Sequence, residues 1–211
     1  MDTSDAAELI GEVPEAAGDN DRANRFRNRA ALMIAILAAA LAIGGLGAGN
    51  ATDDMIFNNI RASDTWAFYQ AKNVRQTAYE IAAEALEADL AAPGLDAGRR
   101  AALQRRLDSY RATIARYDSE PDPAAPNDPL RGEGKTQLRA QALAYEVARD
   151  QAADRDGNFD LAEVFLQLAL VLGSIAILAL NRAICGLAAG LGLVGALLTA
   201  NGFLLLVALP I

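Results

Sequence analysis

The sequence contains no histidine, one cysteine and one tryptophan among its 211 residues. The absence of histidine removes the commonest general base, metal ligand and pH-sensitive side chain. Because Cys185 is the only thiol, no disulfide can form within the chain. A net charge of -8 without a visible basic stripe argues against nucleic acid as a partner. No pairing of nucleophile and base, no metal-ligand cluster and no cofactor loop is visible, so we expect neither an enzyme nor a cofactor.

Hydrophobic residues make up 53% of the chain and charged residues 22%, so the two kinds must be segregated. Three runs, at 30–49, 161–180 and 183–209, are almost free of charge and reach the roughly 20 residues needed to cross a bilayer. The segment 50–160 is polar and rich in helix-forming residues. The sequence therefore predicts an all-α protein with three transmembrane helices. A long, coiled-coil-like extramembrane hairpin joins the first to the second, and the lipid bilayer is the first expected partner.

Residues 1–29 form an acidic leader that we expect to be disordered or at most weakly helical. Arginines close to the apolar runs predict a cytoplasmic N-terminus, which would place residues 50–160 and the C-terminus in the periplasm of a bacterial inner membrane. These arginines are Arg22, Arg25, Arg27, Arg29 and Arg182. A cleaved signal peptide over residues 1–51 is the weaker interpretation, because the apolar run exceeds the roughly 7–15 residues of a signal core.

The first helix should continue from the membrane to about Ala91, where Pro93 and Gly94 end it. Small and branched residues recur at spacings of three and four along it, and we call this set the α-seam. The α-seam consists of Ile56, Ile60, Ser63, Ala67, Ala71, Val74, Ala78, Ile81 and Ala85. Asp96 should cap a second helix. That helix carries a coiled-coil pattern of Leu103, Leu107, Tyr110, Ile114 and Tyr117.

Four prolines lie within residues 120–129, which predicts an extended linker. A third helix should begin near Gly134, with an inner face of Leu138, Ala142, Tyr145, Ala148 and Ala152. The second and third helices would then both run towards the membrane. An extended linker of about 30 Å could return away from the membrane between them, so that all three helices lie side by side. This predicts a three-helix coiled coil. We expect Gly157 and Asn158 to break the third helix, with Asp160 capping the second span.

Two stretches resemble a known family. SDTWAFYQAKNVRQ, at 63–76, looks like the signature of the bacterial membrane family catalogued as domain of unknown function 4337. FDLAEVFLQLALVLGSIAIL, at 159–178, is similar to the family's second hallmark, and the sequence at 201–203 fits its usual ending. The resemblance implies a three-span inner-membrane protein with a helical extramembrane hairpin. It implies no enzymatic activity, because none is assigned to the family. The acidic leader and the proline-rich linker depart from the family pattern.

The first signature is a candidate interaction patch, made of Trp66, Phe68, Tyr69, Lys72 and Arg75. Its aromatic rings fall on two faces of a helix, so a single buried stripe cannot cover them all. Two possibilities are open for the second face: the other helices of the hairpin, or a second copy or partner subunit.

Within the apolar runs, small residues at small-xxx-small spacing should let helices approach closely. They are Gly45, Gly49, Ala169, Gly173, Gly186, Gly190, Gly192 and Gly195. Glu163 and Gln167 form a possible intramembrane polar site, although an interfacial carboxylate is the favoured interpretation of Glu163. We expect Asn201 to make an interhelical hydrogen bond.

The sequence favours a structural or interaction protein that is a homo-oligomer or an accessory subunit of a larger membrane complex. The alternative is a sensor or transport accessory that uses Glu163 and Gln167 or the hairpin.

Overall fold

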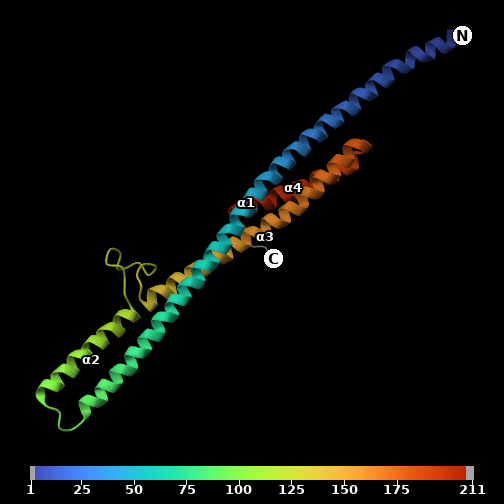
Figure 1. Cartoon of the computed structure of the whole chain (residues 1–211). Coiled ribbons are helices and arrows are strands. Elements are labelled where there is room, and N and C mark those ends of the chain that lie inside the picture. The colour runs from blue at the N-terminus through green and yellow to red at the C-terminus, as the bar shows by residue number, and fades with distance from the viewer. Residues whose placement is uncertain (1–2, 208–211) are drawn as a thin grey trace. The chain divides into compact units, whose positions relative to one another are not determined.

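The computed structural model describes residues 3–207, with side chains from residue 20 onward. This part of the chain contains helices and no strand, which confirms the all-α class. The four helices are α1 (Thr3–Ala91), α2 (Ala97–Asp118), α3 (Lys135–Ala179) and α4 (Arg182–Leu204) (Figure 1). Three of them, α1, α3 and α4, are long and apolar enough to cross a membrane.

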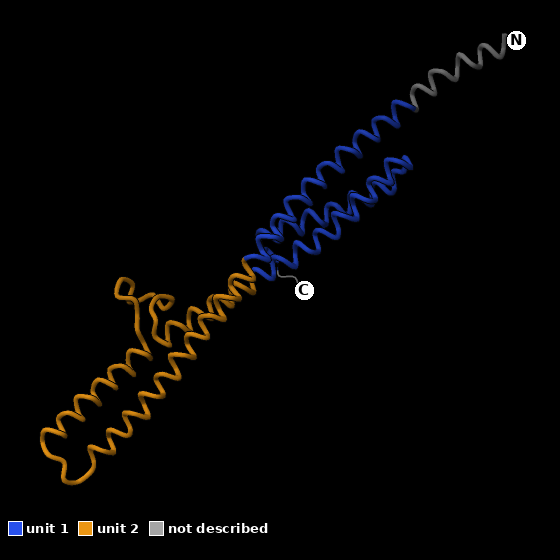
Figure 2. Tube along the Cα trace, in the orientation of Figure 1, with its two compact units in different colours: residues 1–53, 152–211 blue, residues 54–151 orange. Residues whose placement is uncertain are grey.

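The chain divides into two compact units, shown in different colours in Figure 2. Unit 1 comprises residues 1–53 and 152–211, and unit 2 comprises residues 54–151. In unit 1, the first part of α1 packs with the second part of α3 and with α4. In unit 2, the remainder of α1 packs with α2 and with the first part of α3.

Close contacts at glycines define the directions of the helices in unit 1. A Cβ atom placed on Gly173 of α3 would lie 2.9 Å from Ile34 of α1. Earlier on α3, Phe159 lies against Gly47 of α1, so α3 runs antiparallel to α1. Glycines let the helix backbones approach closely where van der Waals packing is the main attraction.

Helix α4 runs parallel to α1 in a constant register. A Cβ atom on Gly192 would lie 2.5 Å from Leu37, and Thr199 lies against Gly44. Both pairs are separated by 155 positions in sequence, since 192 − 37 and 199 − 44 are equal. Gly192 is therefore an inward glycine as predicted, whereas Gly45, Gly49, Gly186 and Gly190 have open space at their Cβ positions.

The centre of unit 1 is a small apolar core. Leu37 of α1 packs there with Leu166 and Ala169 of α3, and all three side chains are buried. Partly buried neighbours complete the core: Met33, Ala40, Leu41, Leu170 and Leu191.

Unit 2 is a hairpin whose turn follows the sequence prediction. Helix α1 ends at Ala91, and Gly94 takes a positive φ of 85° in the turn. The Asp96 carboxylate accepts a hydrogen bond of 2.9 Å from the Arg99 backbone N–H and caps α2. The predicted helix end and the predicted cap are both confirmed.

The three-helix coiled coil is wrong, because in unit 2 α1 packs with α3 over one part of its length and with α2 over the next. Tyr79 and Glu87 of α1 meet Tyr110 and Arg111 of α2. Closer to unit 1 along the chain, Trp66 donates a hydrogen bond to Glu146 of α3. At 1.5 Å per residue, residues 54–91 of α1 cover about 57 Å, and α2 followed by residues 135–151 covers about 59 Å. The first part of α3 therefore packs on α1 where α2 ends, so the linker does not have to return along the hairpin between the two helices.

The proline-rich linker is likewise compact where an extended chain was expected. Pro121 pairs with Gly132 in an isolated antiparallel bridge, and the Glu133 N–H donates to the Glu120 carbonyl at 2.9 Å. Asp122 forms an ion pair of 2.7 Å with Arg131. Aspartates favour turns because their carboxylates accept hydrogen bonds from backbone N–H groups two residues on, as Asp122 does from Ala124. Proline fixes φ but does not prevent successive turns.

The inner face of α1 in unit 2 also differs from the expectation. All nine α-seam residues are exposed. The face that meets α2 and α3 is more polar and includes Ala62, Tyr69, Lys72, Gln76 and Ala83. On α2 and α3 the predicted inner residues are buried or half-buried. Periodicity identified the α-seam, which is the most apolar stripe of α1. However, α2, α3 and the loop before α3 cover a different stripe of α1, whose side chains make hydrogen bonds and ring contacts.

Three element boundaries need correction. Helix α3 continues through Gly157 and Asn158, where a break was predicted, because Asn158 is held by hydrogen bonds to Asp154 and Asn201. Helix α1 already includes residues 20–29, which we expected to be disordered or at most weakly helical, because alanine and arginine favour helix and the apolar run continues it. Helix α4 ends at Leu204, short of residue 209, and residues 208–211 lie outside the described part of the chain.

Candidate functional site

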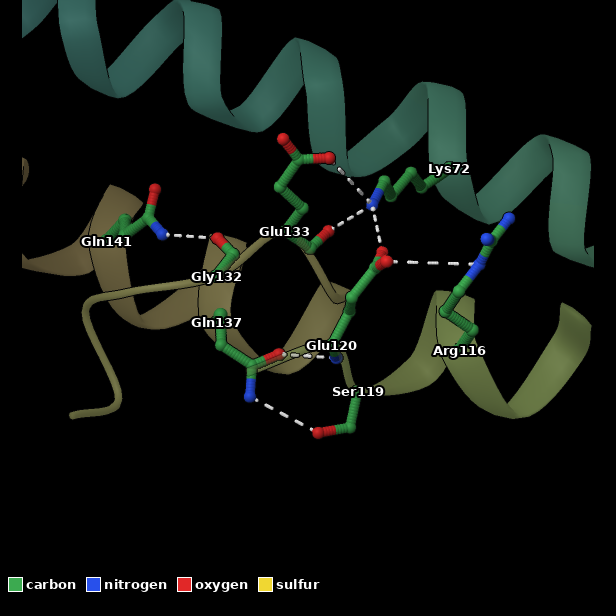
Figure 3. Close-up of polar contacts among 8 residues, drawn as sticks. All are labelled: Lys72, Arg116, Ser119, Glu120, Gly132, Glu133, Gln137 and Gln141. Atoms are coloured by element: carbon green, nitrogen blue, oxygen red, sulfur yellow. Dashed lines mark hydrogen bonds and ion pairs between the residues drawn. The ribbon is translucent and has the colours of Figure 1, made fainter. Parts of the chain in front are cut away.

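The predicted interaction patch includes Lys72, a buried residue at the centre of a polar cluster in unit 2. Lys72 extends from α1 towards the base of the loop between α2 and α3 (Figure 3). Its Nζ donates to Glu120 Oε2 at 3.3 Å and to the Glu133 carbonyl, and it forms an ion pair of 3.8 Å with the Glu133 carboxylate. An ammonium group has three donors, and three acceptor oxygens lie within 4 Å of this one.

We call Lys72, Arg116, Glu120 and Glu133 the Lys72 cluster. The Lys72 side chain is 6% exposed, whereas the side chains of Glu120 and Glu133 are 37% and 70% exposed. Arg116 adds a second cation, 3.9 Å from Glu120. Two cations thus face two carboxylates, so the charge of the buried ammonium is compensated locally.

Side-chain amides of α3 complete the base of the loop. Gln137 accepts a hydrogen bond from the Glu120 N–H at 3.1 Å and donates to Ser119 at 3.2 Å. Gln141 donates to the Gly132 carbonyl at 2.9 Å. The loop is therefore fixed to both α1 and α3 by polar contacts that span distant parts of the sequence (Figure 3). This arrangement can hold a loop in one conformation on the side of the hairpin.

The structure divides the predicted patch into an inner part and an outer part. The Trp66 indole donates to Glu146 Oε1 at 2.8 Å, and its ring meets Tyr69 edge-to-face at 5.5 Å. Phe68 lies 5.2 Å from the Lys72 ammonium but is 40% exposed, and Arg75 is exposed. The helices of the hairpin thus cover Trp66 and Tyr69 in part and Lys72 almost fully. Phe68 and Arg75 lie on the open side.

The second predicted site, Glu163 and Gln167, faces outward. Gln167 donates a hydrogen bond of 2.7 Å to Glu163, and both residues are exposed on α3. The neighbouring face of this helix packs through Ala162 and Leu166, which are fully buried. The pair is therefore brought together by helical spacing alone and does not line the interior of unit 1.

Sequence reasoning missed the role of Asn158. This residue is 1% exposed, and its side-chain oxygen accepts a hydrogen bond of 2.7 Å from Asn201 of α4. The interhelical bond predicted for Asn201 is confirmed, but its partner had been placed at a helix break. Asn201 also binds the backbone of Val207 through both polar atoms of its amide. The sequence did contain a signal for this pair, because Asn158 and Asn201 each place a side-chain amide in or beside an apolar run.

Phe159, next to Asn158, fits between two glycines. A Cβ atom on Gly47 of α1 would lie 2.5 Å from the ring, and one on Gly202 of α4 would lie 2.6 Å from it. Phe203 meets the ring edge-to-face at 4.9 Å. Helices α1, α3 and α4 are therefore joined at one buried aromatic ring, where the sequence had indicated only a family hallmark.

Comparison with known families identifies the family of this chain. The family model described as Domain of unknown function (DUF4337) matches residues 26–205, which is most of the chain. No curated protein and no solved structure matches. The matched region includes the Lys72 cluster, the apolar run of α1, and all of α3 and α4.

Proposed function

Because the chain belongs to the DUF4337 family, whose description assigns no activity, we propose a function from the chain's own surfaces. The protein is a multi-pass membrane protein whose unit 2 associates with a second copy, so that it acts as a structural or interaction protein. Three apolar helices support the membrane location. The exposed α-seam supports the self-association.

The α-seam is the observation that carries this proposal. Its large members are substantially exposed: Ile56 by 50%, Ile60 by 52%, Val74 by 69% and Ile81 by 63%. From Ile56 to Ala85 the seam extends about 44 Å along the helix. A continuous apolar surface of this kind on a water-facing segment is typical of a protein–protein interface.

A second copy fits the α-seam better than an unrelated partner does. The α-seam keeps its four-and-three spacing from Ile56 to Ala85, so the side chains of one copy can insert between those of an identical, parallel copy. In a shared membrane, a twofold axis along the membrane normal would pair the two copies of α1 in parallel. In unit 1 the outward face of α1 continues the same four-and-three spacing with small residues, which favour close helix contact. These exposed residues are Ala31, Ala35, Ala38, Ala42, Gly45 and Gly49.

Charged residues in the α-seam should separate the copies. We expect the double variant Val74→Glu with Ile81→Glu to weaken self-association by about 100-fold, because two apolar side chains per copy lose their burial. Both residues are more than half exposed, so the fold of the single chain should be unaffected. Native mass spectrometry of detergent-extracted protein over a dilution series measures the change.

A matched control uses two exposed apolar residues of α3 in unit 2. Leu143→Glu with Val147→Glu adds the same charge at residues that are 44% and 56% exposed. The control should leave the oligomer intact. A wild-type chain that is monomeric at every concentration, or equal dissociation of both double variants, would contradict the assignment of the α-seam.

The proposed topology places unit 2 in the periplasm of a bacterial inner membrane and the N-terminus in the cytoplasm. Its support is the group of arginines next to the apolar runs. In a Cys185→Ala background, a cysteine at exposed Ala124 should react with a membrane-impermeant maleimide in cells whose outer membrane has been made permeable. A cysteine at exposed Asn24 should react only after lysis. The reverse pattern would invert the topology, and purified protein that stays soluble without detergent would reject the membrane location.

A further inference from the structure

Four arginines and a phenylalanine surround a hollow of about 400 Å³ in unit 1. Three of the arginines, Arg22, Arg25 and Arg29, come from α1 together with Phe26. These four positions follow the i, i+3, i+4, i+7 pattern, so they share one face of the helix. Arg27 does not line the hollow.

The fourth arginine comes from a distant part of the sequence. Arg182 is the first residue of α4, directly after the connection from α3. The register of 155 positions between α4 and α1 places residue 182 level with residue 27, since 182 − 155 = 27. Arg182 is therefore brought into the middle of the arginine segment by the same glycine contacts that pack the core of unit 1.

The hollow has a positive character. Among residues 20–207 no ion pair with a carboxylate compensates Arg25, Arg29 or Arg182. The nearest acidic residue in sequence is Asp21, which is exposed one turn before Arg25. Guanidinium groups bind phosphate through two parallel hydrogen bonds, so Arg25, Arg29 and Arg182 together favour a phosphate-bearing anion.

The position of the hollow selects the source of that anion. Arg29 is followed directly by the apolar run that begins at Ala30, and the half-buried Phe26 supplies an apolar wall beside the arginines. A ligand that carries both a phosphate and acyl chains can use both features, whereas free phosphate can use only the arginines. We infer that this hollow, which we call the arginine pocket, binds the headgroup of an anionic phospholipid at the membrane surface. This inference rests on the proposed membrane location.

The test measures lipid binding to the intact protein. Purified full-length chain in neutral detergent is titrated with phosphatidylglycerol or with phosphatidylcholine, and native mass spectrometry gives the dissociation constant for the first bound lipid. We expect Arg25→Gln, Arg29→Gln and Arg182→Gln each to weaken binding of phosphatidylglycerol by about 5-fold. Binding of phosphatidylcholine should be weaker in the wild type and unchanged in the variants.

Arg27→Gln is the matched control, because it removes the same charge from the same helical segment without touching the pocket. We expect this variant to change the dissociation constant by less than about 2-fold, whereas diffuse attraction to the surface would make all four variants equal. Equal losses would overturn the arginine pocket. Full displacement of the lipid by an equal concentration of inorganic phosphate would overturn the lipid as the ligand. A chain that is soluble without detergent rejects the proposed membrane location, an outcome distinct from both.

Discussion

Replacing Phe159 with alanine is expected to destabilise unit 1 by about 3 kcal/mol, because the variant leaves a cavity where three helices meet. The ring is 3% exposed and lies against Gly47 and Gly202. Without it, the residues around the cavity lose dispersion contacts that no neighbour can replace. For a chain of this size the loss corresponds to a decrease in thermal midpoint of roughly 6–12 °C. Circular dichroism during heating in detergent measures it.

Two further variants separate a specific fit from general loss of apolar surface. Phe203→Ala removes a ring from a residue that is 50% exposed, and it should cost clearly less than Phe159→Ala. Gly202→Ala places a methyl group 2.6 Å from the Phe159 ring and should be destabilising alone. Combined with Phe159→Ala, this methyl group has room, so the two effects should fail to add by about 1 kcal/mol or more. Additive effects, or equal costs for the two phenylalanines, would contradict the proposed packing.

The local signals in the sequence were reliable for where most helices begin and end. Pro93 and Gly94 end α1, and Asp96 caps α2, because proline, glycine and a capping carboxylate act on the residues beside them. The inner faces of α2 and the first part of α3 were also predicted correctly. In these two helices, the residues at the predicted spacing are the buried or half-buried ones.

The sequence predictions failed where a contact between residues far apart in the sequence determines the local structure. Gly157 and Asn158 resemble a helix break, yet the hydrogen bond from Asn201 holds Asn158 in the helix. The apolar α-seam resembles a buried face, yet in the single chain the stripe that contains Lys72 faces inward. Lys72 satisfies its charge only with Glu120 and Glu133, which are 48 and 61 residues away. Periodicity cannot reveal such partners because it describes one helix at a time.

The candidate surfaces show the same division. Trp66, Phe68, Tyr69, Lys72 and Arg75 were identified together from the sequence, but their separation into buried and open sides required the positions of α2 and α3. The arginine pocket adds a distant residue, Arg182, to a run whose members had been interpreted only as a signal of orientation. In both cases the residue types could be read from the sequence. Which of them meet is determined by the loop and helix positions for the patch, and by the glycine contacts for the arginine pocket.

Replacing Gly132 with alanine is expected to open the loop between α2 and α3 and to cost about 3 kcal/mol or more locally. Gly132 has a φ of 120°, which residues with a side chain rarely adopt. The Cβ atom of the new alanine would lie 2.2 Å from the Glu120 carbonyl oxygen. The Glu120 backbone cannot move away without losing the hydrogen bond that its carbonyl accepts from the Glu133 N–H. Lys72 would then lose the acceptors that hold its ammonium group in the interior.

Hydrogen–deuterium exchange measures this opening directly. A local cost of this size should speed exchange of the Asp122 and Glu133 amides by about 100-fold, because both donate to backbone carbonyls across the loop. Gly94→Ala is the matched control, since Gly94 also has a positive φ, of 85°, but open space at its Cβ position. Only the conformational strain of about 1 kcal/mol applies there, so exchange in its turn should increase by about 5-fold. Equal effects at the two glycines would show that backbone conformation alone, and not the contact with Glu120, keeps the loop closed over Lys72.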